Sequence, residues 1–529
     1  MSSHQPAAEA RSRIRRAIID GQLDAAGAML DRLLASDPGD AAVYMLAGRL
    51  AAARRDPAGE LAMMRKAVEH DPANGDYRAF LARCFARAAA IEQALACIDE
   101  ALAREPLSDL ALDAIAGTLG QFGRHSEAVA MLGRAVDAGS RNPAIYFNLG
   151  NALRFVGDFA GARGAFERAL QLAPQFHKAH AALTALGGIT ADRNNLPRLA
   201  VMIEQSHDPR ARIHLCHAAA KECEALGRFD EAWECLQAGK AGLRAAVPND
   251  PDLVLASMDR LAEIAPDILA AQNSAGSGKS PIFIVGMPRS GTTVLDRIVS
   301  NHSQVTSIGE SLYFAQLLKN ACGSTSNQLL DDAILEALSG GVDLAHIGER
   351  YVERGEMLSK GSPRFLDKFH LNFMLAGHLL RALPDARILC LVRNPLDTIT
   401  SNFRQLFEFE SALYAYSLDI LATTNFYIRF RRLAALWEQL APDRFRTVGY
   451  EALVSNPEVE TAGLLSFCNL GWEEGCTAIE RNTASVATAS AVQVRSKIHG
   501  GAIGTWRRYE RHLDGVRTRL ANAGLPSDR

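Results

Sequence analysis

A glycine-rich turn that contains one arginine has the residue types best suited to binding an anion. Residues 282–285 are apolar and predict a short buried strand that ends at Gly286. A second glycine follows at position 291, and apolar residues at helical spacing begin at Val294. A strand, a turn and a helix in this order direct backbone N–H groups and the positive end of the helix at one point, which suits a phosphate or sulfate. The candidate ligands are Arg289, Ser290, Gly291, Thr292 and Thr293.

The turn departs at one position from the nucleotide-triphosphatase pattern G-x-x-x-x-G-K-[ST]. Thr292 stands where that pattern has the lysine that reaches the β- and γ-phosphates. Arg289 is the only cation inside the turn, and its planar guanidinium suits an oxyanion with several acceptor atoms. The turn therefore predicts a single phosphate or sulfate group, whereas a P-loop kinase would need the lysine and carboxylates for magnesium. The alternative is an ordinary strand–helix turn with incidental glycines.

A second strand and turn carry two further candidate anion ligands. Residues 388–392 predict a buried strand, and Arg393 follows it. Asp397 lies in the first turn of the next predicted helix, and Ser401 lies one turn later on the same face. Because ligands of parallel sheets bind beyond the carboxyl ends of strands, we expect Arg393 and Ser401 to hold a second phosphate of the ligand bound at Arg289. Taken alone, an arginine after a strand more often indicates a surface ion pair.

The elements around these residues predict two kinds of architecture. From Pro281 onward, strands alternate with helices, which is typical of a mostly parallel sheet with helices on both faces. The N-terminal part repeats with a period of 34 residues, in registers that begin at Ala41, Gly75, Asp109 and Pro143. The shared columns of small residues resemble the tetratricopeptide repeat, in which each unit is a pair of antiparallel helices.

We expect the chain to have three parts. Residues 1–190 form a repeat array, residues 191–272 form further helices that cap the array and link it, and residues 273–529 form the strand–helix region. Such an array offers a curved surface that suits an acceptor peptide or a protein partner. A rigid spacer or a dimer surface is the alternative, and the oligomeric state stays open.

Composition excludes several classes of function. The net charge of −3 over 529 residues gives no general attraction to nucleic acid or to anionic membranes. The nine cysteines form no C-x-x-C motif, so neither a zinc site nor a disulfide framework is indicated. The first residues lack the apolar core of a signal peptide, and no run of about 18 apolar residues predicts a membrane span. We therefore expect a cytoplasmic protein.

The two strand–turn motifs resemble the donor-binding motifs of sulfotransferases that use 3′-phosphoadenosine 5′-phosphosulfate (PAPS). They read Pro-Arg-Ser-Gly-Thr-Thr at 288–293 and Val-Arg-Asn-Pro-Leu-Asp-Thr-Ile-Thr-Ser at 392–401. Residues 450–457 and 488–509 are similar to bacterial tetratricopeptide-repeat sulfotransferases, and the catalytic half is similar to tyrosylprotein sulfotransferases. The resemblance implies an N-terminal all-α tetratricopeptide-repeat superhelix and a C-terminal α/β P-loop-type sulfotransferase domain with a mostly parallel sheet.

The resemblance also assigns donor-binding residues, and it implies no metal. It implies that residues 289–293 hold the 5′-phosphosulfate and that Arg393 and Ser401 hold the 3′-phosphate. The residues implied to line the nucleotide are Tyr450, Ser490, Gln493, Arg495 and Lys497.

Two positions depart from the tyrosylprotein enzymes. Those enzymes have an arginine where this chain has Gln405, beside Arg404, and a lysine where it has Thr505. The missing charge has three candidate sources, which are Arg495, Lys497 and Arg507.

Sulfuryl transfer needs a base for the acceptor hydroxyl and cations for the leaving phosphate, and the resemblance implies both. Glu310 matches the base of the tyrosylprotein enzymes, and Lys368 matches the lysine that stabilises the bridging oxygen, with Arg289 as a further cation. His370, in Lys-x-His, matches the base of cytosolic sulfotransferases. We favour Glu310 as the base and keep His370 as the alternative. The simpler interpretation is a helix cap for Glu310, a solvated surface lysine for Lys368 and a core histidine for His370.

The leading hypothesis is a PAPS-dependent sulfotransferase that releases adenosine 3′,5′-bisphosphate and whose repeats engage the acceptor. The resemblance suggests a peptide or protein tyrosine as the acceptor. A carbohydrate or lipid-linked hydroxyl is the alternative acceptor. A non-catalytic repeat scaffold with a relic nucleotide-binding domain is the alternative class, although relics commonly lose at least one of the charged residues that this chain keeps.

Overall fold

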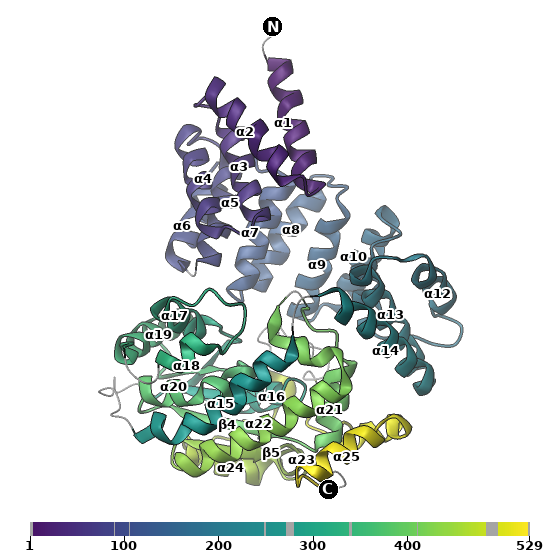
Figure 1. Cartoon of the computed structure of the whole chain (residues 1–529), viewed down its shortest axis with the longest axis vertical. Helices are drawn as coiled ribbons and strands as arrows, with labels where there is room; N and C mark the ends of the chain where they lie inside the picture. Colours follow the sequence, from purple (N-terminus) through teal and green to yellow (C-terminus); the bar gives the residue numbers. More distant parts are fainter. Residues whose placement is uncertain are drawn as a thin grey trace. The chain divides into compact units, whose positions relative to one another are not determined.

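The computed structural model describes residues 4–88, 90–104, 106–247, 250–270, 280–337, 341–409, 411–482 and 496–526. The chain divides into two compact units, Met1–Pro174 and Gln175–Arg529 (Figure 1). Their division does not test the predicted boundaries at residues 190 and 272, which stay a prediction.

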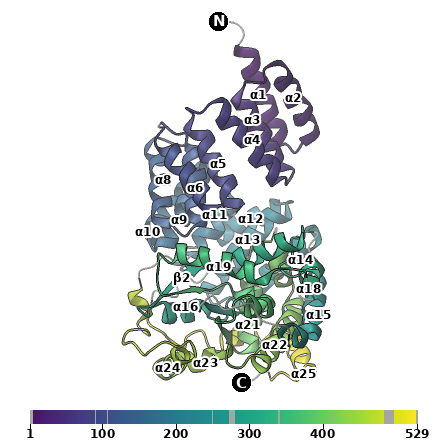
Figure 2. The same cartoon turned by 90° about the vertical axis from the view of Figure 1, so that its left-hand side faces the viewer.

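The first unit is built from helix pairs (Figure 2). Its described helices are α1 (His4–Ile19), α2 (Leu23–Ser36), α3 (Ala41–Ala53), α4 (Pro57–His70), α5 (Gly75–Arg87), α6 (Ile91–Leu102), α7 (Asp109–Gln121), α8 (His125–Asp137), α9 (Pro143–Val156) and α10 (Phe159–Leu172). The helices α3, α5, α7 and α9 begin where the four predicted registers begin. The 34-residue period therefore predicted these helix starts.

A capping residue recurs with the same period and explains why the helices start there. Asp40, Asn74, Ser108 and Asn142 each accept a hydrogen bond from a backbone N–H in the first turn of the helix that follows. Such a side chain satisfies an N–H group that has no partner within the helix. The small residues of one predicted column are fully buried between the helices: Ala67, Ala101, Ala135 and Ala169.

The second unit begins with further helices and continues into the sheet. These leading helices are α11 (His177–Ala185), α12 (Leu196–Gln205), α13 (Pro209–Ala225), α14 (Phe229–Ala246) and α15 (Pro251–Ala270). The helices α13 and α14 pack as a pair that turns at Gly227. Both belong to the same compact unit as the sheet, so their side chains are available to its sites.

Five described strands form one parallel sheet in the order β2-β3-β1-β4-β5. They are β1 (Ile282–Gly286), β2 (Val305–Gly309), β3 (Arg364–Asp367), β4 (Arg387–Val392) and β5 (Phe445–Gly449). The predicted strands at 282–285 and 388–392 are thus β1 and β4, and β1 is buried along its whole length. The chain leaves β1 toward one edge of the sheet and leaves β4 toward the other. Ligands of such sheets bind at this reversal, beyond the ends of β1 and β4.

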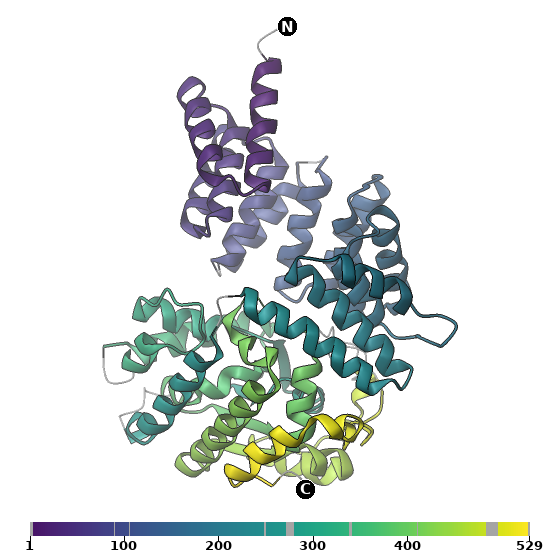
Figure 3. The ribbon, with the colours of Figure 1, turned by 45° about the vertical axis from the view of Figure 1, so that its right-hand side comes forward.

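Helices and short 3₁₀ segments cover the sheet. They are α16 (Thr292–Ser300), α17 (Tyr313–Cys322), α18 (Asp332–Ala337), α19 (Leu344–Leu358), η1 (His370–Leu375), α20 (Ala376–Ala382), α21 (Pro395–Arg404), η2 (Ala412–Leu418), α22 (Ile420–Leu440), α23 (Tyr450–Ser455), α24 (Pro457–Phe467), η3 (Ile479–Arg481), η5 (Thr505–His512) and α25 (Asp514–Asn522). The C-terminal helix α25 packs along α22 (Figure 3). No helix among the described residues has the length and apolar character needed to cross a membrane. A cytoplasmic location stays a prediction.

Candidate functional site

The turn after β1 depends on two glycines. Gly291 has a φ of 111°, and a Cβ there would lie 2.5 Å from the ring of Tyr450. A Cβ at Gly286 would lie 2.7 Å from the carbonyl oxygen of Leu391 on the neighbouring strand. Arg289 also has a positive φ, of 63°, which is uncommon for a residue with a side chain and occurs at functional sites. The backbone is therefore drawn close against β4 and α23, as an anion-binding turn requires.

We expect Gly291→Ala to weaken nucleotide binding and to lower stability. The added methyl group would collide with Tyr450, and the positive φ would be strained, so about 1–3 kcal/mol should be lost. Thermal unfolding and titration with adenosine 3′,5′-bisphosphate measure the two effects. Gly164→Ala is the matched control, since the same methyl group meets nothing within 4 Å in helix α10. Equal behaviour of the two variants would contradict the packing role of Gly291.

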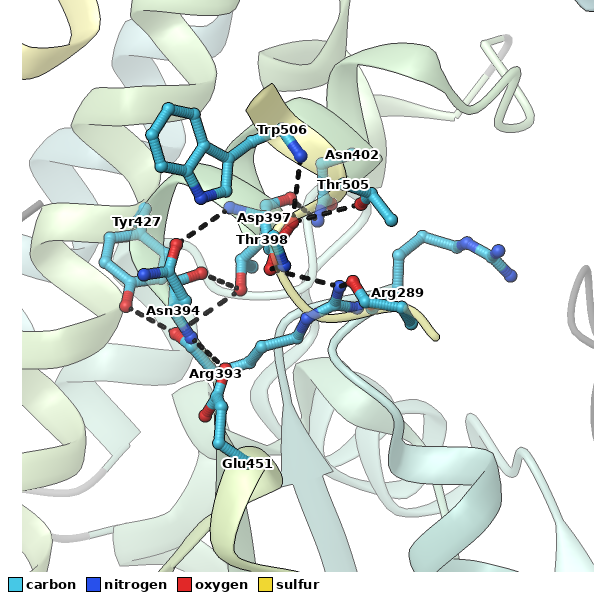
Figure 4. Close-up of polar contacts among 12 residues, drawn as sticks. Arg289, Arg393, Asn394, Asp397, Thr398, Asn402, Tyr427, Glu451, Thr505 and Trp506 are labelled. Carbon is cyan, nitrogen blue, oxygen red and sulfur yellow. Dashed lines mark hydrogen bonds and ion pairs between the residues drawn. The ribbon is translucent and has the colours of Figure 1, made fainter. Parts of the chain in front are cut away.

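Side chains from neighbouring helices hold the two anion-binding turns in place (Figure 4). Asn402 of α21 is fully buried and donates a hydrogen bond of 2.6 Å to the carbonyl oxygen of Pro288. The Tyr427 hydroxyl of α22 donates one of 3.0 Å to the carbonyl oxygen of Arg393. Glu451 accepts a hydrogen bond of 2.9 Å from the backbone N–H of Asn394. These contacts join the ends of β1 and β4 into one rigid edge.

Arg393 lies at the centre of this edge and is 7 % exposed. Its Nη1 donates to the carbonyl oxygen of Arg289 at 3.3 Å, and its Nη2 is 3.5 Å from Asp397 Oδ2. The guanidinium lies over the Tyr450 ring, 4.8 Å from the centroid, and also donates to the carbonyl oxygen of Ala502. Its buried Nε has no hydrogen-bond partner among the described residues, which leaves a donor for a ligand.

Asp397 brings the C-terminal segment to the same place. Its Oδ2 accepts from Gly504 N at 2.7 Å, and its Oδ1 accepts from the Thr505 hydroxyl and from Trp506 N, both at 3.0 Å. Figure 4 shows these contacts beside Arg393. Thr505, at a position where the tyrosylprotein pattern has lysine, therefore anchors the start of η5 to α21.

A cavity of about 300 Å³ opens over the two turns. It is lined by seven of the predicted donor-binding residues, namely Arg289, Gly291, Thr293, Arg393, Ser401, Tyr450 and Lys497. Ser290 lies in the same turn and donates its hydroxyl to the carbonyl oxygen of Met287 at 2.7 Å, and Thr292 is buried at the first position of α16. Ser490, Gln493 and Arg495 lie outside the described residues. The binding roles of all these residues stay predictions.

The cavity is strongly cationic. Beside Arg289, Arg393 and Lys497, its lining contains Lys221, Arg404 and Arg508, and no aspartate or glutamate lines it among the residues that the structure describes. Burial, followed by the charges of Arg404 and Arg393, lowers the pKa of Arg289 to about 10. Several cations held together in a partly buried hollow predict a ligand with more than one negative charge.

Three of these cations, Lys221, Arg404 and Arg508, were not predicted as site residues from the sequence. Arg508 lines the cavity, whereas the guanidinium of the predicted Arg507 lies over the Trp506 ring, 4.9 Å from its centroid. Lys221 comes from α13, far from either turn in the sequence. A lone lysine in a helix carries no local signal, so only the folded chain brings it to the cavity.

A second cluster lies at the carboxyl ends of β2 and β3. Lys368 is 3 % exposed and its Nζ donates to Glu310 Oε1 at 2.6 Å. The Nδ1 atom of His370 is 3.9 Å from the same oxygen, and its Nε2 is 3.1 Å from the Tyr414 hydroxyl. The Glu310 side chain is 33 % exposed. The structure therefore brings together three of the four predicted catalytic residues, with the carboxylate facing solvent most; the fourth, Arg289, lines the cavity over the turn after β1.

Buried groups fix the geometry of this cluster. Asp367 is fully buried and accepts hydrogen bonds from the Tyr351 hydroxyl, from Phe369 N at 3.0 Å and from Ser311 N at 3.4 Å. Burial raises the pKa of Asp367 to about 7. The backbone N–H of Lys368 donates to the carbonyl oxygen of Gly309 at 2.9 Å. The turns that carry Glu310 and Lys368 are thereby tied to each other.

The electrostatics differ between the two candidate bases. Burial would raise the pKa of Glu310, but the charges of Lys368 and His370 outweigh it, so this pKa is lowered. Burial lowers the pKa of His370 to about 4, with Glu310 opposing and Lys368 adding to the shift. At neutral pH Glu310 is therefore ionised and His370 is neutral.

No group of three or more histidine, cysteine, aspartate or glutamate side chains that could hold a metal ion occurs in the described ranges. The two clusters are a cationic cavity over the turns after β1 and β4 and, at the ends of β2 and β3, a carboxylate paired with a lysine.

Two family models match the chain. The model described as "Sulfotransferase family" matches residues 281–474, and the model described as "Tetratricopeptide repeat" matches residues 143–176. The first match spans β1 to β5, both anion-binding turns and the Glu310–Lys368 pair.

Two individual proteins are also similar to part of the chain. An uncharacterized protein of Aquifex aeolicus (strain VF5) is 31% identical over 257 residues, which are 47% of this chain and 34% of that protein. This chain therefore spans about a third of the length of that relative. A Caenorhabditis briggsae protein described as "Putative protein-tyrosine sulfotransferase" is 23% identical over 233 residues, which are 42% of this chain and 80% of that protein.

Among solved structures, the sulfotransferase domain from the curacin biosynthetic pathway is 16% identical and covers 47% of this chain and 98% of its own, with a TM-score of 0.31. The family models and the observed architecture together confirm the predicted fold class: residues 143–176 match the tetratricopeptide repeat, and residues 281–474, which contain the parallel sheet, match the sulfotransferase family.

Proposed function

We propose that this protein transfers a sulfuryl group from PAPS to a hydroxyl group of an acceptor. The observation that carries the proposal is the cationic cavity over the ends of β1 and β4, two strands that lie within the part of the chain that matches the sulfotransferase family. PAPS carries a phosphosulfate and a separate phosphate, and two arginine-bearing turns border this cavity. In this proposal residues 289–293 hold the 5′-phosphosulfate, and Arg393 and Ser401 hold the 3′-phosphate.

The Glu310–Lys368 pair supports a direct transfer. PAPS supplies the sulfuryl group. Glu310 accepts the proton of the acceptor hydroxyl while the acceptor oxygen bonds to sulfur and the bond from sulfur to the bridging oxygen breaks. Lys368 stabilises the negative charge that develops on that oxygen. The products are a sulfate ester and adenosine 3′,5′-bisphosphate, so the charges and atoms balance without a redox partner or a metal.

The acceptor that we propose is a tyrosine of a peptide or protein. The support is the similarity to a Caenorhabditis briggsae protein named for tyrosine sulfation and the presence of a repeat array, a surface type that suits peptides. The test is mass spectrometry of the products formed from PAPS and a mixture of tyrosine peptides and glycans. Sulfated tyrosine is the expected product, and sulfation confined to glycans would replace tyrosine by a carbohydrate acceptor.

Donor binding separates an enzyme from a relic scaffold. We expect Arg393→Ala to weaken binding of adenosine 3′,5′-bisphosphate about ten- to a hundredfold, because a charged hydrogen-bond partner contributes about 1.5–3 kcal/mol. Calorimetric titration measures the effect, and thermal unfolding checks that the edge of the sheet stays folded. Arg507→Ala is the control, since Arg507 packs on Trp506. If the unmodified protein does not bind this nucleotide, the scaffold alternative is favoured. If the unmodified protein binds it and Arg393→Ala binds it equally well, Arg393 is not a ligand of the nucleotide.

A further inference from the structure

Helix α13, which precedes the sulfotransferase-family match, contributes a charged side chain to the donor cavity. Lys221 lines the cavity together with Arg404 and Ser401 of α21. The side chain of Lys221 is 28% exposed, and its Nζ is 3.0 Å from Glu224 Oε2, one turn further along α13. Part of the cavity wall is therefore made by a helix that the family motifs do not include.

Glu224 holds three groups of this wall in position. Its carboxylate receives a two-pronged contact from Arg404, with Nε 2.6 Å from Oε1 and Nη2 2.7 Å from Oε2. Oε1 also accepts from the Tyr509 hydroxyl at 2.7 Å. Its pKa is held well below the usual range because the contacts with Arg404 and Lys221 outweigh the effect of burial. The single negative charge of Glu224 thus faces the two positive charges of Arg404 and Lys221, which leaves a net positive charge at the cavity wall.

The position of this excess charge matches a gap in the sequence motif. Gln405 stands where the similar enzymes have a further arginine one turn past the serine, and Gln405 itself lines the cavity beside Arg404 and Ser401. An amide carries no charge, so the 3′-phosphate would lack a cation on this side. Lys221 and Arg404 line the same cavity as Gln405, and Glu224 contacts both cations.

We propose that Lys221, oriented by Glu224, is a direct ligand of the 3′-phosphate of the donor nucleotide and that the helical segment before the sheet is part of the donor site. This inference rests on the proposed function. Lys221 and Arg393, which line the same cavity, donate to the phosphate monoester, and Arg404 adds a further charge from α21. Burial and then the charge of Arg404 lower the pKa of Lys221 to about 8. A dianion bound beside Lys221 would favour its protonated form and so oppose this shift.

The test compares two nucleotides that differ in the 3′-phosphate. Adenosine 3′,5′-bisphosphate and adenosine 5′-monophosphate are titrated by calorimetry into the full-length protein and into Lys221→Ala. We expect Lys221→Ala to lose about ten- to a hundredfold in affinity for the bisphosphate and to keep its affinity for the monophosphate. Retained monophosphate binding also shows that the variant is folded. Lys221→Arg should recover part of the loss.

The matched control is Lys178→Ala, which removes an exposed lysine from α11, a helix that packs on α13, and leaves the cavity lining intact. It should bind both nucleotides as the unmodified protein does. Equal losses for both nucleotides in Lys221→Ala, or no loss for either, would overturn the assignment of Lys221 to the 3′-phosphate while leaving the donor proposal standing. Failure of the unmodified protein to bind the bisphosphate would overturn both.

Discussion

Lys368→Met should lower the rate of sulfuryl transfer in a single turnover by about 10²–10³-fold at saturating PAPS. The physical reason is that a preorganised donor aimed at developing charge typically contributes this much to an enzymatic rate. Lys368 is nearly inaccessible to water; Glu310 accepts a hydrogen bond from its ammonium group, and the backbone N–H of Lys368 donates to the carbonyl oxygen of Gly309. It therefore needs little reorganisation when the bridging oxygen becomes negative.

The same variant should change the pH dependence. The charge of Lys368 is the main influence that lowers the pKa of Glu310 against the effect of burial. Without that charge the pKa of Glu310 rises, so at a given pH a smaller fraction of the carboxyl is ionised. The acid limb of the rate profile should therefore move to higher pH. A variant that was only less stable would not show this shift.

Lys360→Met provides the comparison for Lys368→Met, because Lys360 is an exposed lysine of the same domain. Its rate and pH profile should equal those of the unmodified protein. If Lys368→Met keeps its rate within about threefold, Lys368 has no role in stabilising the leaving group. If the rate falls but the acid limb stays in place, the Lys368–Glu310 pair does not govern the ionisation of the base.

The fold was predictable where a local pattern controls it. A capping side chain recurs every 34 residues before α3, α5, α7 and α9, and this explains why the sequence period located those helix starts. The strand β1 and residues 388–392 of β4 are short apolar runs bounded by glycine or a charge, which is the local signature of a buried parallel strand. In both cases the information lies within a few residues of the element.

The sequence predicted the site residues near the turns after β1 and β4, but not those that α13 contributes to the cavity wall. Arg289, Arg393 and Ser401 sit in motifs next to the strands that position them, and all three line the cavity. Lys221 and Glu224 reach the site through a contact with Arg404, which is 180 residues further along the chain than Glu224. Such pairings depend on how α13 packs in the folded unit. No spacing rule within a single sequence contains that information.

The identity of the base shows the same limit. The motif Lys-x-His offered His370 as an alternative to Glu310, and sequence alone does not show what either side chain contacts. In the structure the Nε2 atom of His370 is engaged with the Tyr414 hydroxyl and its Nδ1 faces Glu310, so both ring nitrogens point at protein groups. Glu310 has a third of its side chain exposed and is the ionised member of the pair. The geometry supports Glu310 as the group that meets the acceptor hydroxyl.

We accordingly expect Glu310→Gln to lower the single-turnover rate by about 10²–10⁴-fold, the usual contribution of a positioned base, and His370→Asn to lower it less than about tenfold. Glutamine keeps the size of the side chain, so nucleotide binding should persist in Glu310→Gln and separate a chemical defect from a binding defect. Tyr414→Phe frees His370 Nε2 and should leave the rate nearly unchanged if Glu310 is the base.

The pH profile of Glu310→Gln decides between the two bases. With Glu310 as the base, the residual rate should lose its acid limb, because the titrating carboxyl is gone. With His370 as the base, the limb should remain and move to lower pH, since the negative charge of Glu310 is what raises the pKa of His370 toward its present value of about 4. A large loss in His370→Asn together with a surviving acid limb in Glu310→Gln would transfer the role to the histidine. The carboxylate would then act by holding His370 and Lys368 in position.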